Sequence, residues 1–213
     1  MRAVNTIILA SNNDHKLDEL RELLKSLKEP IHIEPIRKFI RNSDKIGLAE
    51  KFETYAENAA AKARTANQGA HYPCLADDSG LEIEALQGRP GVRSHRYAIP
   101  KAGQSQDMAN VEKILEELKG HTMDKRKAKF VCSLVLVIEG ISIEAEGILE
   151  GTIAEAPQGT NGFGYDPIFI PKGSQITLAE MTDHEKNSIS HRANALKTLL
   201  EKVKSHGVVF AKP

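Results

Sequence analysis

The chain opens on a strand, a polar turn and a helix, and this succession constrains the fold more than any other feature of the sequence. Residues 4–10 are apolar and rich in β-branched side chains, as in a buried strand. Residues 11–14 read Ser-Asn-Asn-Asp, and leucines between 17 and 27 then recur at helical spacing. Strand-like and helix-like segments keep alternating along the 213 residues, which predicts an α/β protein with one mixed sheet.

Three further segments give specific structural expectations. Apolar spacing predicts a helix over 48–67. A short strand is expected over 74–76, ending in the acidic segment that begins with Asp77 and Asp78. A single final helix is expected to carry the apolar positions from 189 to 203, with Thr182 and Glu185 placed like a capping box.

Composition excludes several classes of protein. Lys and Arg total 29 and balance 29 Asp and Glu, so no bulk positive charge is available to attract nucleic acid. The longest apolar run, residues 130–138, is much shorter than the roughly 20 residues of a membrane span. Cys74 and Cys132 lack metal-ligand spacing, and residues 1–10 lack the features of a signal peptide. We expect a cytoplasmic protein that binds neither nucleic acid nor membrane.

Two polar segments follow predicted strands. Ser11, Asn13 and Lys16 lie where a strand feeds a helix, so backbone N–H groups and a lysine could cradle a phosphate; a capped turn with a solvated lysine is the alternative. The adjacent carboxylates of Asp77 and Asp78 suit Mg²⁺ with a phosphate completing its shell; an acidic turn is the alternative. Because neighbouring strand residues point to opposite faces, one of the two aspartates should face a given site.

Two later segments suit a flat polar ligand. Residues 159–167 place glycines around Phe163, whose ring could stack on such a ligand. Lys186, His191 and Arg192 lie at or before the start of the final helix, where a bound anion or polar group would offset their unfavourable interaction with the helix dipole. A structural turn and a solvated basic face are the respective alternatives.

In this order, the four segments resemble the inosine triphosphate pyrophosphatase family, which acts on non-canonical purine nucleoside triphosphates. The resemblance spans about 7–200 and is carried by ADDSGLEIEALQGRPGVRS (76–94), GTNGFGYDPIF (159–169) and EKNSISHRANAL (185–196). It implies one domain over 1–213, with a long mixed β-sheet and flanking helices forming two lobes around a nucleotide cleft, and a homodimer. It also implies hydrolysis of ITP, dITP or XTP to the monophosphate and pyrophosphate, which would cleanse the nucleotide pool.

The resemblance further implies roles for individual residues. The implied catalytic residues are Asp78, Lys16 and Lys62. The implied substrate-binding residues are Ser11, Asn13, Lys16, Ser79, Phe163, Gly164, Tyr165, Asp166, Lys186, His191 and Arg192. Asp78 and Glu50 are the implied ligands of Mg²⁺; Glu53 is the alternative to Glu50, because Phe52 stands where the family usually has glycine.

The expected mechanism follows from these roles. Lys16, Lys62 and Mg²⁺ would offset the charge of the triphosphate, and the metal, Asp78 or both would activate water. If Asp78 ligates the metal, Asp77 or a metal-bound hydroxide becomes the better proton acceptor. Donor groups on Lys186, His191 or Arg192 would favour a 6-oxo purine over adenine.

Two competing hypotheses remain. One is a catalytically silent nucleotide-binding protein. The other is a related pyrophosphatase for modified pyrimidine or methylated nucleotides, against which the Phe163 segment together with His191 and Arg192 favours purines.

Overall fold

The structure, a computed structural model, describes residues 2–41, 43 and 51–211. Its helices are α1 (Asp14–Ser26), α2 (Tyr55–Ala70), α3 (Gln106–Glu117), α4 (Asp183–Ile189) and α5 (His191–Ser205). Its strands are β1 (Arg2–Val4), β2 (Thr6–Leu9), β3 (His32–Pro35), β4 (Cys74–Ile83), β5 (Lys127–Ile138), β6 (Ile141–Ile153), β7 (Phe169–Pro171) and β8 (Val208–Phe210). Among the helices of the described chain, none combines the length and apolar character needed to cross a membrane.

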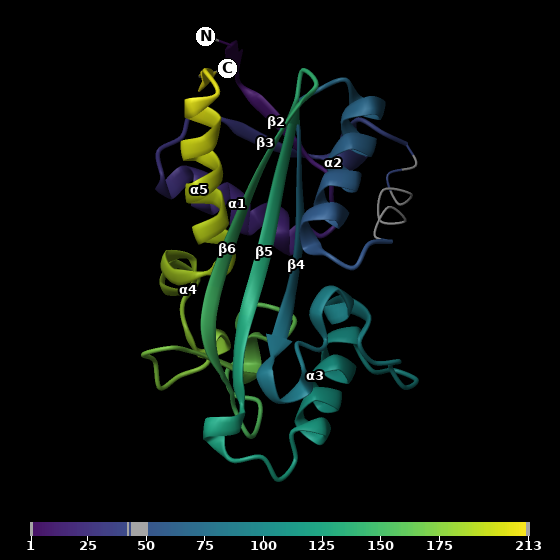
Figure 1. Ribbon diagram of the computed structural model, residues 1–213, viewed down its shortest axis with the longest axis vertical. Helices are drawn as coiled ribbons and strands as arrows, with labels where there is room; N and C mark the ends of the chain where they lie inside the picture. The colour runs from purple at the N-terminus through teal and green to yellow at the C-terminus, as the bar shows by residue number, and fades with distance from the viewer. Residues whose placement is uncertain (1, 42, 44–50, 212–213) are drawn as a thin grey trace. The chain divides into compact units, whose positions relative to one another are not determined.

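Most of the strands form one mixed sheet (Figure 1). Across the described residues its order is β3-β2-β4-β5-β6-β7. Strand β2 pairs in parallel with β3 and β4, whereas β6 and β7 are antiparallel. Strands β1 and β8 form a separate parallel pair. The predicted fold class, α/β with a mixed sheet and flanking helices, is confirmed.

The opening strand and helix lie where the sequence predicts them. The side chain of Asn13 accepts a hydrogen bond from the backbone N–H of Lys16 and so caps α1. The buried face of α1 consists of leucines three and four positions apart: Leu17, Leu20, Leu23 and Leu24. This stripe packs α1 onto the core beside the sheet.

Helix α2 begins later than its apolar spacing indicates. The expected helix started at residue 48, but residues 51–54 are not helical and residues 48–50 lie outside the described residues. Thr54 has an extended backbone, and its side chain accepts a hydrogen bond from the N–H of Glu57. This cap fixes the start of the helix at Tyr55.

The acidic segment lies inside a strand that is longer than the one expected over 74–76, so the alternative of an acidic turn is wrong. Strand β4 continues from Cys74 through Asp77 and Asp78 to Ile83. Asp and Gly are depleted in strands, which is why this segment resembles a turn in the sequence. Ion pairs with buried cations from other elements override that local preference.

The final helical segment is two helices and not one. Ser190 has an extended backbone, with φ −60° and ψ 152°, and separates α4 from α5. Neither Gly nor Pro marks the break, so apolar spacing does not reveal it. The predicted capping box of Thr182 and Glu185 is confirmed at the start of α4.

The chain divides into two compact units. Unit 1 comprises Met1–Asp78, Cys132–Gly147 and Arg192–Pro213; unit 2 comprises Ser79–Val131 and Ile148–His191. In unit 1, α1 and α5 pack on one face of the strands and α2 on the other (Figure 1). Unit 2 has its own core, which includes the buried face of α3. Strands β4, β5 and β6 each contribute residues to both units.

Candidate active site

Asp77 lies at the centre of a buried ion-pair network in unit 1. Its side chain is 0% exposed; its Oδ1 accepts from Lys16 Nζ at 2.5 Å and its Oδ2 from Arg192 Nε at 2.7 Å. The Cys132 thiol lies 3.4 Å from the same Oδ2. Burial acts to raise the pKa of Asp77, but Arg192 and Lys16 outweigh burial and hold this pKa well below its usual range. Asp77 is therefore a fixed anion.

Arg192 has a second carboxylate partner, Glu19 of α1. The Arg192 side chain is 2% exposed, and its Nη1 donates to Glu19 Oε2. Burial acts to lower the pKa of Arg192, but Asp77 and Glu19 raise it, so the guanidinium stays charged. The sequence pattern does not single out Glu19; its one local signal is the position one helical turn after Lys16. A purine contact by Arg192 stays a prediction.

Asp78 and Lys62 form a second buried pair. Lys62 Nζ lies 3.1 Å from Asp78 Oδ1, and the two side chains are 5% and 10% exposed, respectively. Lys62 Nζ also donates to the backbone oxygen of Asp77 at 2.7 Å, and Lys16 Nζ lies 3.5 Å from that same oxygen. The predicted alternation is confirmed, because Asp77 contacts α1 and α5 whereas Asp78 contacts α2. Two ammonium groups from opposite faces nevertheless meet at one carbonyl.

The loop before α1 is ordered by its own side chains. Ser11 Oγ accepts a hydrogen bond from the N–H of Asn13 at 3.1 Å, and Asn13 Oδ1 accepts one from the N–H of Lys16 at 3.1 Å. The alternative of a capped turn is thus correct as far as the cap is concerned. The same geometry places the start of α1 beside the Lys16 side chain, so it is compatible with the predicted phosphate cradle.

The predicted metal ligands lie only partly within the described residues. Glu50 lies outside them, and its alternative, Glu53, is exposed just before α2. Within the described chain, no three His, Cys, Asp or Glu side chains gather as a metal-binding group. Mg²⁺ commonly takes one or two carboxylates and completes its shell with water and phosphate oxygens. The hard oxygen donors of Asp78 fit that pattern.

In unit 2, Asp166 joins the aromatic loop to a buried lysine. Asp166 Oδ2 accepts a hydrogen bond from the N–H of Phe163 at 2.9 Å and one from Lys186 Nζ at 2.7 Å. Lys186 Nζ lies 4.8 Å from the centroid of the Phe163 ring. Three of the predicted substrate-binding residues are thus assembled into one cluster, with an ammonium over an aromatic face.

The other predicted residues of unit 2 are placed by neighbouring contacts. Tyr165 donates its phenolic proton to the backbone oxygen of Ser94 at 2.7 Å, and burial raises the pKa of Tyr165. The His191 ring stacks on Phe130, with centroids 4.8 Å apart and planes 12° apart. Ser79 is partly exposed in β4.

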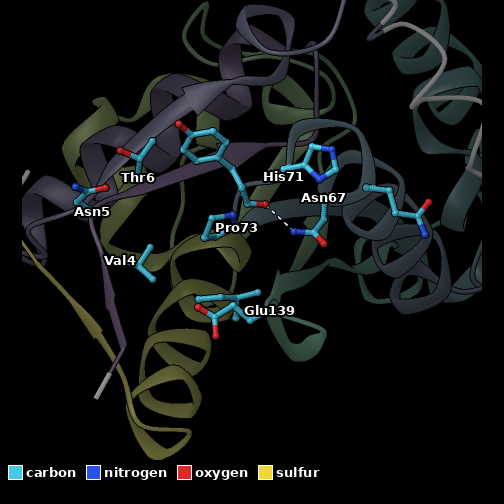
Figure 2. Close-up of a pocket in the computed structure, with 10 residues that line it drawn as sticks. Val4, Asn5, Thr6, Asn67, His71, Pro73 and Glu139 are labelled. Atoms are coloured by element: carbon cyan, nitrogen blue, oxygen red, sulfur yellow. Dashed lines mark hydrogen bonds between the residues drawn. The ribbon is translucent and has the colours of Figure 1, made fainter.

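A separate cavity of about 660 Å³ lies in unit 1 (Figure 2). Asn5 and Thr6, at the start of β2, line one part of it, and Asn67 and His71, at the end of α2, line another. Its described lining residues include none of the predicted site residues. The predicted site residues of the described chain therefore lie outside this cavity.

Sheet topology, acidic strand and glycine-rich aromatic loop together define a distinct class of mixed α/β protein. The chain belongs to the Ham1 family, whose model matches residues 7–202. A dITP/XTP pyrophosphatase of Bacillus subtilis strain 168 is 45% identical over 197 residues, covering 90% of this chain and 93% of that protein. A dITP/XTP pyrophosphatase of Clostridium perfringens strain 13 is 42% identical over 204 residues, covering 92% and 96%.

Solved structures agree with this assignment. The Staphylococcus aureus Ham1 protein superimposes with a TM-score of 0.79 at 36% identity. The superposition covers 95% of this chain and 100% of that chain. A HAM1 protein from Coxiella burnetii gives a TM-score of 0.80 at 40% identity, with coverage of 95% and 100%. The family resemblance and the expected mixed α/β fold are confirmed.

Proposed function

We propose that this protein hydrolyses the non-canonical purine nucleoside triphosphates ITP, dITP and XTP to the monophosphate and pyrophosphate, and so cleanses the nucleotide pool. The Ham1 family membership and the names of the relatives support this activity. In the structure, the observation that carries the proposal is the convergence of Lys16 and Lys62 on the carbonyl of Asp77. Fixed cations beside two carboxylates suit a triphosphate of about four negative charges.

Residues of unit 1 are proposed to act on the triphosphate. Lys16 and Lys62 would stabilise negative charge that develops on the phosphates, and both ammonium groups are already oriented by backbone and carboxylate oxygens. Ser11, Asn13 and the N–H groups at the start of α1 would bind a terminal phosphate.

Asp78 is proposed to hold Mg²⁺, with Glu50 or Glu53 as a second carboxylate. When bound, this ion would neutralise part of the phosphate charge. The support is the chemistry of the donor set: hard oxygens on β4 next to two lysines, where phosphate oxygens would complete the coordination shell.

Asp77 is proposed not to be the proton acceptor; this role would fall to Asp78 where its carboxylate does not ligate Mg²⁺ directly. Asp77 is fully buried, and its pKa is held well below the usual range by Arg192 and Lys16, so it is a weak base. Asp78 is paired with Lys62 through Oδ1, and its side chain is 10% exposed.

Residues of unit 2 are proposed to bind the base. Phe163 would stack on the purine, and Lys186, held by Asp166, would donate to the 6-oxo group. Adenine presents a donor at that position, so the ammonium would discriminate against it. Gly164, Tyr165, Ser79 and His191 of unit 2 are proposed as further substrate contacts, and so is Arg192 of unit 1.

We further propose a single two-lobed domain, a homodimer and a cytoplasmic location. One family model spans residues 7–202, which supports a single domain. Two buried thiols, Cys74 and Cys132, suit a reducing compartment. The homodimer rests on the family resemblance.

The experiment is a substrate panel. Pyrophosphate release is measured for ITP, XTP, GTP, ATP and dUTP, with and without Mg²⁺. The proposal predicts Mg²⁺-dependent release that is fast for ITP and XTP and slow for ATP and dUTP. Comparable rates on ATP and ITP would refute the selectivity, and binding of ITP without turnover would favour a silent nucleotide-binding protein.

A further inference from the structure

The Phe163 loop, residues 159–166, is held on both sides of its aromatic tip. On one side, the N–H groups of Thr160 and Asn161 donate to the carbonyl of Ala179 at 3.1 and 3.0 Å. At the tip, the N–H of Phe163 donates to Asp166. These anchors come from the loop itself and from the segment that follows it.

The anchor on the other side comes from a distant element. Asp107, in the first turn of α3, accepts a hydrogen bond from the N–H of Gly164 through Oδ2 at 2.8 Å. Gly164 has a φ of +64°, and no heavy atom of the described chain beyond its neighbours lies within 4 Å of where a Cβ would stand. Packing around its Cα therefore does not fix this residue, whereas the hydrogen bond that its N–H donates to Asp107 does.

A second contact ties the same part of the loop to α3. Tyr165 donates to the backbone oxygen of Ser94, and Asn110 of α3 donates to that oxygen at 3.1 Å. Gly164 and Tyr165 follow the aromatic tip. Both are thus linked to the amino-terminal half of α3, Gly164 directly and Tyr165 through the backbone oxygen of Ser94. Among the residues that make these hydrogen bonds, Asp107 is the one with a charged side chain.

We propose that Asp107 is a positioning residue, which sets the orientation of the Phe163 ring for the purine by holding the N–H of Gly164. This inference rests on the proposed function. Asp107 lies outside the three segments that carry the family resemblance. Its effect belongs to base binding, because it reaches the substrate only through the loop that carries Phe163.

A purely structural role makes a different prediction. A carboxylate in the first turn also stabilises α3 through the helix dipole, an effect that depends on charge and not on contact with Gly164. Asp107→Glu keeps the charge but moves the carboxylate by one methylene. Asp107→Asn removes the charge but keeps an oxygen acceptor in place. The two roles therefore rank these variants in opposite order.

The test measures KM and kcat for ITP with Mg²⁺, and inhibition by pyrophosphate, in both variants and in Glu112→Gln, an exposed residue of the same helix. We expect Asp107→Glu to raise KM for ITP about tenfold, and Asp107→Asn to stay within about twofold of wild type. In both variants, kcat and pyrophosphate inhibition should stay within about twofold, and Glu112→Gln should match wild type.

The inference is overturned if both variants keep the wild-type KM, if Asp107→Asn is the more damaged one, or if affinity for pyrophosphate falls with that for ITP. Each of these results leaves wild-type hydrolysis of ITP intact. A wild-type protein that releases no pyrophosphate from ITP would instead refute the proposed function and this inference with it.

Discussion

At the scale of single residues, Asp77 balances a buried cation, Arg192, and a partly buried one, Lys16, and should stabilise the fold through its charge. Asp77→Asn leaves Lys16 and Arg192 in place with one anion fewer, and breaking such a buried pair costs about 3–5 kcal/mol. We expect urea titration to show a loss of that size in the free energy of unfolding. The control is Asp14→Asn, whose exposed pair with Arg37 should contribute less than about 1 kcal/mol. Equal losses of unfolding free energy in the two variants would contradict the stabilising role of the buried ion-pair network.

Asp77 also predicts how stability depends on pH. Its pKa is depressed in the folded protein and about 3.9 in the unfolded chain, so between these values the unfolded chain binds more protons. The stabilisation is present above the unfolded pKa and is lost as pH falls toward the folded one. Urea midpoints from about pH 6 down to pH 3 should fall more steeply in wild type than in Asp77→Asn. Parallel curves would show that Asp77 does not carry this dependence.

Lys16 tests the proposed charge stabilisation directly. Lys16→Gln removes a fixed cation, and loss of one such electrostatic contact typically costs about 10²-fold in rate. We expect kcat/KM for ITP, measured as pyrophosphate release, to fall by about that factor. Lys25→Gln alters an exposed lysine of the same helix and should leave activity unchanged. A loss below about threefold for Lys16→Gln would remove this residue from the proposed mechanism.

At the scale of elements, the sequence pattern predicts the structure correctly where interactions within one element determine it. The leucine stripe and the Asn13 cap of α1 are such a case, because both signals lie within one helix. Strand β4 is the opposite case. Its Asp-Asp-Ser-Gly segment is turn-like locally, and the partners that keep it in the strand, Lys16, Lys62 and Arg192, come from three other elements.

No local sequence pattern indicates the contacts between residues that are far apart in the chain. The pair of Glu19 and Arg192 joins residues 173 apart, and Asp107 and Gly164 are 57 apart. Neither Glu19 nor Asp107 lies in a motif whose spacing indicates chemistry. The family resemblance could assign segments to a substrate, but the partners that orient those segments appear only in the folded protein.

Glycines in the loop elements give a further prediction. Gly159 has a φ of +80°, and a Cβ there would lie 2.3 Å from the backbone of Ala179, whereas Gly173 has a φ of +85° with open space around it. Both alanine variants carry backbone strain of about 1–2 kcal/mol, but only Gly159→Ala adds a backbone clash. Thermal denaturation should show the larger fall in Tm for Gly159→Ala. Equal shifts would contradict the close packing of this loop on Ala179.

At the scale of the whole molecule, two of the motifs that carry the family resemblance supply residues to both units. The boundary between units falls at the peptide bond from Asp78 to Ser79 and again from His191 to Arg192. Whole-chain resemblance could predict the fold class and the family, because both depend on the order of many segments at once.

The central claim is that the two lysines and the adjacent aspartates serve cleavage between the α and β phosphates. Phosphorus NMR of the products formed from ITP with Mg²⁺ tests it most directly. We predict that IMP and pyrophosphate appear together and in equal amounts from the first time point. Accumulation of IDP and orthophosphate would contradict the claim.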